Sequence, residues 1–148
     1  MMQVRATLFG ALVIASLVAA TPRDSAVILN SGSTNTVGFK ITVWSDGQAS
    51  LAQQNRDGSA AGAKSFTVPA AVAARFFADL AAARSSNAAT VPCMKSASFG
   101  TSTHVTWQGW VSPDLECPPK TSAGDALVKD VQDIREASGI PKETLRQH

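Results

Sequence analysis

The stretch FKITVWSDGQASL, residues 39–51, decides the fold class of this 148-residue chain. From Val37 onward, apolar side chains alternate with polar or aromatic ones, which is the period of a half-buried β-strand. Asp46 and Gly47 interrupt this pattern, and Gln48–Gln53 continues it as a weaker strand. Because Asp-Gly is a preferred pair for a type I′ turn, the sequence predicts a β-hairpin.

Further strands are predicted on both sides of this hairpin. Ala26–Asn30 is a short apolar run that we expect to form the first strand. Lys95–Phe99 and Ser102–Val111 are predicted as a second hairpin that turns at Gly100-Thr101. Together these elements predict a four- to five-stranded, mostly antiparallel sheet.

Two amphipathic helices are predicted after the first hairpin. Pro69 opens the first, which runs to about Arg84 with one apolar stripe. Ser122 caps the second, Asp125 completes its capping box, and Gly139 ends it. Pairs at i,i+4 are expected between Arg75 and Asp79 and between Asp125 and Lys129. The acidic residues of the second helix are expected on a solvated surface: Asp125, Asp130, Asp133 and Glu136. The fold class is therefore α+β, with two helices packed on one face of the sheet.

The chain has two cysteines, Cys93 and Cys117, which bracket the predicted second hairpin. An even count in an exported protein predicts one disulfide. Closing a loop of this length stabilises a domain by roughly 3–4 kcal/mol in the chain-entropy model. The same count and compartment disfavour a catalytic thiol.

The N-terminus carries the pattern of a secretory signal peptide. Arg5 precedes the apolar run of residues 6–20, and small residues stand before a cleavage point after Ala20. The run is shorter than the ~20 residues of a membrane-spanning helix. We therefore predict a signal peptide at residues 1–20, a secreted or periplasmic location, and no stable membrane insertion after cleavage.

The remaining residues, 21–148, are predicted to form a single globular domain, with residues 141–148 as a frayed tail. Thirteen Lys and Arg stand against 11 Asp and Glu, with no basic run, so nucleic acid is not an expected partner. The sequence holds no phosphate-binding loop, dinucleotide glycine pattern or metal-ligand spacing. We therefore predict no cofactor and no metal.

The stretch SFGTSTHVTWQGW, residues 98–110, carries the hydroxyl and imidazole groups that a hydrolase would use. A serine nucleophile, His104 as base and Asp114 as acid form one hypothesis, a secreted hydrolase centred on His104. The sequence has no G-x-S-x-G turn to present a nucleophile, and alternation along a strand explains the hydroxyls equally well. We therefore predict no catalytic residue and a protein that is not an enzyme.

Alternation also predicts a surface that could bind a partner. If residues 102–110 form one strand, then His104, Thr106, Gln108 and Trp110 share the face that points away from the helices. Trp44 falls on the same side of the first hairpin. Aromatic side chains rimmed by polar groups suit recognition of proteins or sugars, whereas loops folded over that face would leave it only structural.

The leading prediction is a secreted, non-enzymatic binding or interaction module. Its partner would be an extracellular or envelope protein or a glycan. The segment Cys117-Pro118-Pro119-Lys120, stiffened by proline and anchored by a disulfide, raises a protease-inhibitor-like alternative.

Three stretches resemble small exported bacterial domains to which no activity is assigned. They are FKITVWSDGQASL, SFTVPAAVAARFFADLAAA and TSTHVTWQGW, the last of which precedes a helix rich in Leu, Val and Ile. The resemblance spans most of residues 21–148, over which the order of the predicted elements is similar to that in these domains. It implies an α+β fold and an exported location, and it brings no catalytic residues.

Overall fold

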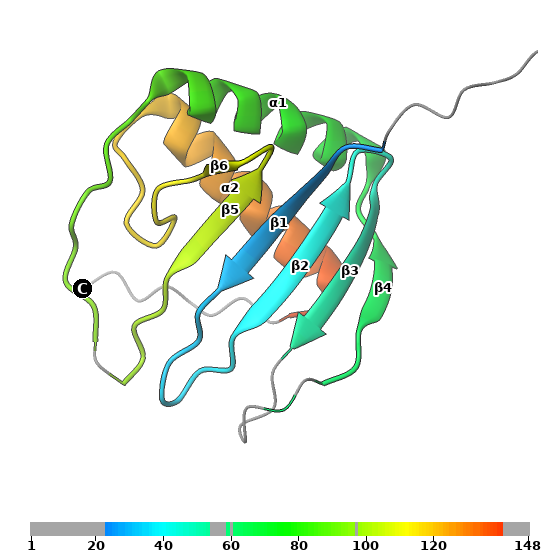
Figure 1. Ribbon diagram of the computed structural model, residues 1–148, viewed down its shortest axis with the longest axis horizontal. Coiled ribbons are helices and arrows are strands. Elements are labelled where there is room, and N and C mark those ends of the chain that lie inside the picture. Colours follow the sequence, from blue (N-terminus) through cyan, green and yellow to red (C-terminus); the bar gives the residue numbers. More distant parts are fainter. Residues whose placement is uncertain (1–22, 54–58, 60, 97, 141–148) are drawn as a thin grey trace, which may run out of the picture.

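The computed structural model describes residues 23–53, 59, 61–96 and 98–140 (Figure 1). The predicted signal peptide, residues 1–20, and the predicted tail, residues 141–148, lie outside the described residues. Within the described part, no helix is long and apolar enough to cross a membrane.

One sheet and two helices make up the described part of the fold. The strands are β1 (Ser25–Asn30), β2 (Phe39–Trp44), β3 (Gln48–Gln53), β4 (Lys64–Thr67), β5 (Thr103–Trp107) and β6 (Trp110–Val111), and the helices are α1 (Ala70–Ser86) and α2 (Ser122–Ser138). The sheet has the order β4-β3-β2-β1-β5-β6, and all neighbouring strands are antiparallel. This arrangement confirms the predicted α+β class, with six strands where four to five were expected.

Alternation along the strands places the buried apolar side chains on the side of the sheet that faces the helices. Ile28 of β1 pairs with Ile41 of β2 and Val105 of β5, and all three are completely buried. Phe76 of α1 and Ile134 of α2 belong to the same apolar cluster. Both helices lie on this one side of the sheet, as Figure 1 shows, so the described residues place no helix on its opposite face.

The first hairpin forms where the sequence predicts it, but its turn differs. The loop has three residues, Ser45–Gly47, and only Gly47 has a positive φ, of 84°. The N–H of Gly47 donates to the carbonyl of Trp44. Three-residue hairpin loops commonly place one left-handed residue last, so a single glycine is sufficient and the predicted type I′ turn is wrong.

The second hairpin lies further along the chain than predicted. Described residues of the stretch 95–99 form no strand, and β5 ends at Trp107. Gln108 and Gly109 both have positive φ, 48° and 77°, and they turn the chain into β6. Because the loop has two residues, Trp110 lies directly opposite Trp107, on the helix side of the sheet.

The helices begin and end close to their predicted residues. Pro69 is the N-cap of α1, and Gly139, with a φ of 81°, ends α2 as predicted. The N-cap of α2 is Thr121 instead of Ser122, and its hydroxyl accepts the N–H of Gly124. The capping side chain thus comes from one residue earlier than predicted.

The ion pairs of the two helices involve other partners than the predicted ones. Arg75 of α1 donates to Asp130 and Asp133 of α2, and Lys129 pairs with Asp133. The side chain of Asp130 has no exposed surface, so its predicted place on a solvated helix face is wrong. The reason is that α1 packs on the helix face that carries it.

Candidate functional site

The predicted aromatic face is only partly assembled. Thr106 and His104 of β5 and Trp44 of β2 alternate with buried neighbours and face away from the helices. Trp110 does not join them, because the two-residue turn places it beside Trp107 against the core. Gln108 lies in that turn, where its side chain contacts those of Asp24 and Arg84. The five predicted binding residues therefore do not form one surface.

The aromatic residue left on that face is already in contact with a neighbour. The guanidinium of Arg23 lies 4.8 Å from the ring centre of Trp44, and the same group pairs with Asp46. A cation over an indole ring shields part of its apolar surface. The other large apolar side chains exposed on the open face are Leu29 and Val111.

The groups of the hydrolase hypothesis are engaged elsewhere. His104 Nδ1 lies 3.0 Å from the carbonyl oxygen of Ser112, which can only accept, so Nδ1 carries the hydrogen. Asp114, the predicted acid, pairs with Lys95 and not with His104. Ser102 Oγ lies 2.8 Å from the ammonium of Lys95, which donates all of its N–H groups and has no lone pair to act as a base.

The predicted disulfide is present and joins two unlike segments. Cys93 and Cys117 are bonded, with 5.8 Å between their Cα atoms. Cys117 is buried, whereas Cys93 and every other residue of 89–96 is exposed. We call residues 89–96 the displayed segment. It has no helix or strand and runs along the side of the molecule from the end of α1 toward the far end of the sheet (Figure 1).

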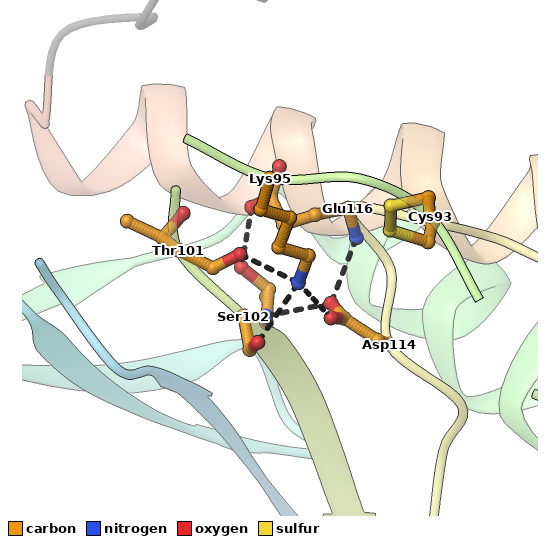
Figure 2. Close-up of a disulfide and its surroundings, with 8 residues drawn as sticks. Cys93, Lys95, Thr101, Ser102, Asp114 and Glu116 are labelled. Carbon is orange, nitrogen blue, oxygen red and sulfur yellow. Dashed lines mark hydrogen bonds and ion pairs between the residues drawn. A yellow bond between two sulfur atoms is a disulfide. The ribbon is translucent and has the colours of Figure 1, made fainter. Parts of the chain in front are cut away.

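Lys95 gives the displayed segment a second attachment, two residues after the disulfide. Figure 2 shows its side chain reaching toward β5 and the chain before Cys117. Its ammonium donates to the carbonyl of Thr101 at 2.7 Å, to Ser102 Oγ and to the carboxylate of Asp114. All three donors of the ammonium are used, so the position of Lys95 is fixed from three directions.

Asp114 is held in place to receive this lysine. Its Oδ1 atom accepts the backbone N–H groups of Thr103 and Glu116, each at 3.0 Å (Figure 2). Burial raises the pKa of Asp114, but the hydrogen bonds from Lys95 and from these two N–H groups outweigh burial. The pKa therefore lies below its ordinary value of 3.8, and the carboxylate stays charged at neutral pH.

Met94 stands between these two attachments. Its side chain is fully exposed, at 102% of the reference value, although both neighbouring residues are anchored. Exposed large apolar side chains are usual as single residues, but Val91 and Phe99 are exposed in the same stretch of chain. The carbonyl of Ser98 accepts hydrogen bonds from Ser33 and Asn35, which ties this stretch to the loop between β1 and β2.

Sequence reasoning missed Met94 and Lys95 because it assigned them to a strand or its entrance. The sequence does hold one signal, a charged residue close to each cysteine. Lys95 follows Cys93 by two residues, and Asp114 precedes Cys117 by three. An opposite charge beside each cysteine of a disulfide favours an ion pair alongside the bond.

A small cavity lies behind this site, between β5, the segment before Cys117 and α2. Its volume is about 20 Å³, and its lining includes Thr103, Glu116, Val131 and Arg135. Ligand pockets are typically ~300–1,000 Å³, so this cavity has room for a single water and not for a small-molecule substrate.

Neither metal chemistry nor relatedness points to an activity. No group of three or more His, Cys, Asp or Glu side chains in the described residues could hold a metal ion. Comparison with protein-family models, curated proteins and solved structures finds no match to this chain. The displayed segment is therefore the candidate functional site.

Proposed function

We propose that this protein is a non-enzymatic binding module whose contact surface is the displayed segment. The observation that carries the proposal is the placement of Met94, whose fully exposed side chain stands between the disulfide of Cys93 and the ion pair of Lys95. A partner that takes up Met94 meets a chain whose flanking residues are already fixed.

The energetic argument is preorganisation. Immobilising a rotamer-rich side chain or a loop on binding costs about 0.5–1.5 kcal/mol per side chain. The disulfide and the three hydrogen bonds of Lys95 have already restricted the backbone on both sides of Met94. Less conformational entropy is therefore lost when the segment is bound, and affinity rises.

Protease inhibition is the form of binding that this geometry favours. An endopeptidase cleft accepts a segment of chain without secondary structure and takes one side chain into its specificity pocket. Met94 is long and apolar, so the matching enzyme has a hydrophobic pocket, as chymotrypsin does. In protease–inhibitor complexes, the contact surfaces of both partners are typically preformed, and their backbones move little on binding.

Residues 117–120 suggest the inhibitor-like alternative in the sequence, whereas we propose the displayed segment, at the other end of the disulfide, as the inhibitory segment. Cys117 and Pro119 are buried, and Pro118 is partly buried. Among these four residues Lys120 alone is exposed, and a segment held in this way cannot enter a cleft in another protein. Residues 117–120 fit better as the base on which the displayed segment is held.

The proposal is tested by measuring inhibition constants of the purified protein against chymotrypsin, subtilisin and trypsin. We expect inhibition at micromolar concentration or below for the two enzymes with apolar pockets. Met94→Asp should weaken it by at least about 100-fold, because burying an unpaired carboxylate in an apolar pocket is costly.

A matched control separates the segment from the rest of the surface. Val111→Asp makes the same change from an exposed apolar side chain to a charge, at a residue that is 55% exposed in β6. It should leave inhibition unchanged. If none of the enzymes is slowed at micromolar concentration, or if Met94→Asp inhibits as well as the wild type, the proposal is wrong.

Export is part of this proposal. A disulfide is compatible with an oxidising compartment outside the cytosol. N-terminal sequencing of the protein recovered from the extracellular or periplasmic fraction should begin at Thr21. Recovery of an intact Met1 from that fraction would contradict the predicted signal peptide.

A further inference from the structure

The contact between α1 and α2 contains a buried carboxylate that is not fully paired. Asp130 of α2 has no exposed side-chain surface. Its Oδ1 atom accepts a hydrogen bond from Arg75 Nε at 2.5 Å, but its Oδ2 atom has no hydrogen-bond partner among the described residues. A buried acceptor without a donor is costly, so this oxygen calls for an explanation.

The charged groups around Asp130 do not supply the missing donor. Arg75 divides its guanidinium between Asp130 and Asp133, and Lys129 also binds Asp133. The other ionisable group that α1 brings to Asp130 is Asp79, a second carboxyl. From β4, which also packs on α2, the ammonium of Lys64 lies near Gly139 at the far end of the helix.

Two carboxyl groups in contact can satisfy each other only if one of them holds a proton. The hydroxyl of the protonated group then donates to the ionised one. With such a proton, Asp130 Oδ2 becomes part of a hydrogen bond to Asp79. Without it, two negative charges face each other and share the positive charge of a single arginine, Arg75.

We propose that Asp79 and Asp130 share one proton in the folded protein, and that this proton acts as a pH-sensitive latch between α1 and α2. In mildly acidic solution the proton is bound and the latch is closed. As the pH rises and the proton is lost, the contact between α1 and α2 becomes weaker. The latch uses no residue of the displayed segment, so it goes beyond the proposed binding function and does not rest on it.

The direction of the effect follows from proton binding. Burial raises the pKa of Asp130 to about 6, the hydrogen bond from Arg75 opposes this rise, and Asp79 adds to it. The unfolded chain has the ordinary value of 3.8. The contribution to stability is therefore complete below pH 3.8 and is lost as the pH rises through about 6.

The test is denaturant unfolding of the full protein at pH 5 and pH 8. The unfolding equilibrium constant of the wild type should rise about tenfold between these values, through proton linkage. In Asp79→Asn the amide donates to Asp130 at either pH, so the rise should fall below about twofold. Asp125→Asn, at an exposed residue in the first turn of α2, is the matched control and should keep the wild-type rise.

A second measurement decides the matter if Asp79→Asn does not fold. The chemical shift of the Asp130 carboxyl carbon is followed by NMR as the pH of the intact wild-type protein is varied. It should report protonation of the carboxyl group near pH 6. A titration of Asp130 at its ordinary pH, or an unchanged rise in unfolding in a folded Asp79→Asn, would overturn the latch.

Discussion

The two segments joined by the disulfide differ in almost every physical respect. Around Cys117, every residue of the chain from Ser112 to Pro119 is buried or partly buried. The backbone N–H groups of Ser112 and Leu115 donate to carbonyls of β5. Around Cys93, all residues of the displayed segment are exposed, and the side chains of Cys93 and Lys95 hold it.

This difference separates the two tasks of the site. The segment before and after Cys117 is a base, because backbone hydrogen bonds and buried side chains fix it to the sheet. The displayed segment adds little buried surface, so it is available for contact with a partner. Changes in the base should therefore lower stability, whereas changes at side chains of the displayed segment that make no attachment, such as Met94, should alter binding alone.

Removing the connection between the two segments should have the largest effect. The double substitution Cys93→Ser and Cys117→Ser should lower the free energy of unfolding by about 3–4 kcal/mol. The reason is that the unfolded chain gains entropy when the loop between two cysteines separated by 24 residues is no longer closed. The double substitution should also weaken inhibition, because one anchor of Met94 is lost. Denaturant unfolding and inhibition assays check both effects. An unchanged inhibition constant in the folded variant would show that this anchor is unnecessary.

A truncation in the base should have the next largest effect. Leu115 is 7% exposed and belongs to the apolar core. Leu115→Ala should destabilise the protein by about 2–3 kcal/mol, from lost burial and the cavity left behind. Denaturant unfolding measures the change. A loss below about 0.5 kcal/mol, which is usual for surface positions, would mean that the segment is not a base.

The ion pair between the segments should have a smaller and pH-dependent effect. Asp114→Asn should cost about 1–2 kcal/mol at pH 7, because charged hydrogen bonds become neutral ones. The pKa of Asp114 is lowered in the folded state, so its contribution is present above pH 3.8 and is lost as the pH falls further. Thermal unfolding between pH 7 and pH 2 should show the stabilities of the wild type and of Asp114→Asn converging in acid. A constant difference across that range would contradict the role assigned to the carboxylate.

Truncating the displayed side chain should have the smallest effect on stability. Met94→Ala should change the free energy of unfolding by less than about 0.5 kcal/mol, because the side chain makes no buried contact. The same variant should weaken inhibition clearly, which unfolding and inhibition assays measure in parallel. A destabilisation comparable to that of Leu115→Ala would erase the distinction between base and displayed segment.

The sequence predicts the fold where local chemistry and burial agree. Alternation around Ile41 and the Asp46-Gly47 pair locate the first hairpin, and Pro69 and Gly139 mark helix ends. The second hairpin was misplaced because Gln108 is not a usual residue for positive φ. Its two-residue turn reverses the chain without breaking the visible alternation, so Trp110 was assigned to the wrong face.

The site was less predictable than the fold, because it depends on contacts between distant residues. The disulfide followed from the count of cysteines, but which cysteine is buried depends on packing against β5. Lys95 and Asp114 are 19 residues apart, and no local pattern pairs them. Likewise, the sequence around Asp130 gives no local sign that this residue is buried. Its burial results from the packing of α1 against α2. Function, export and the absence of catalysis remain predictions.

The most direct test of the account is the backbone mobility of Met94 in the oxidised protein. The N–H order parameter of Met94, measured by NMR relaxation, should be about 0.85, as in rigid backbone, and similar to that of Leu115. An exposed side chain on a rigid backbone is what preorganised binding requires. An order parameter below about 0.6 at Met94, with a rigid Leu115, would contradict the claim that two anchors hold the displayed segment ready for its partner.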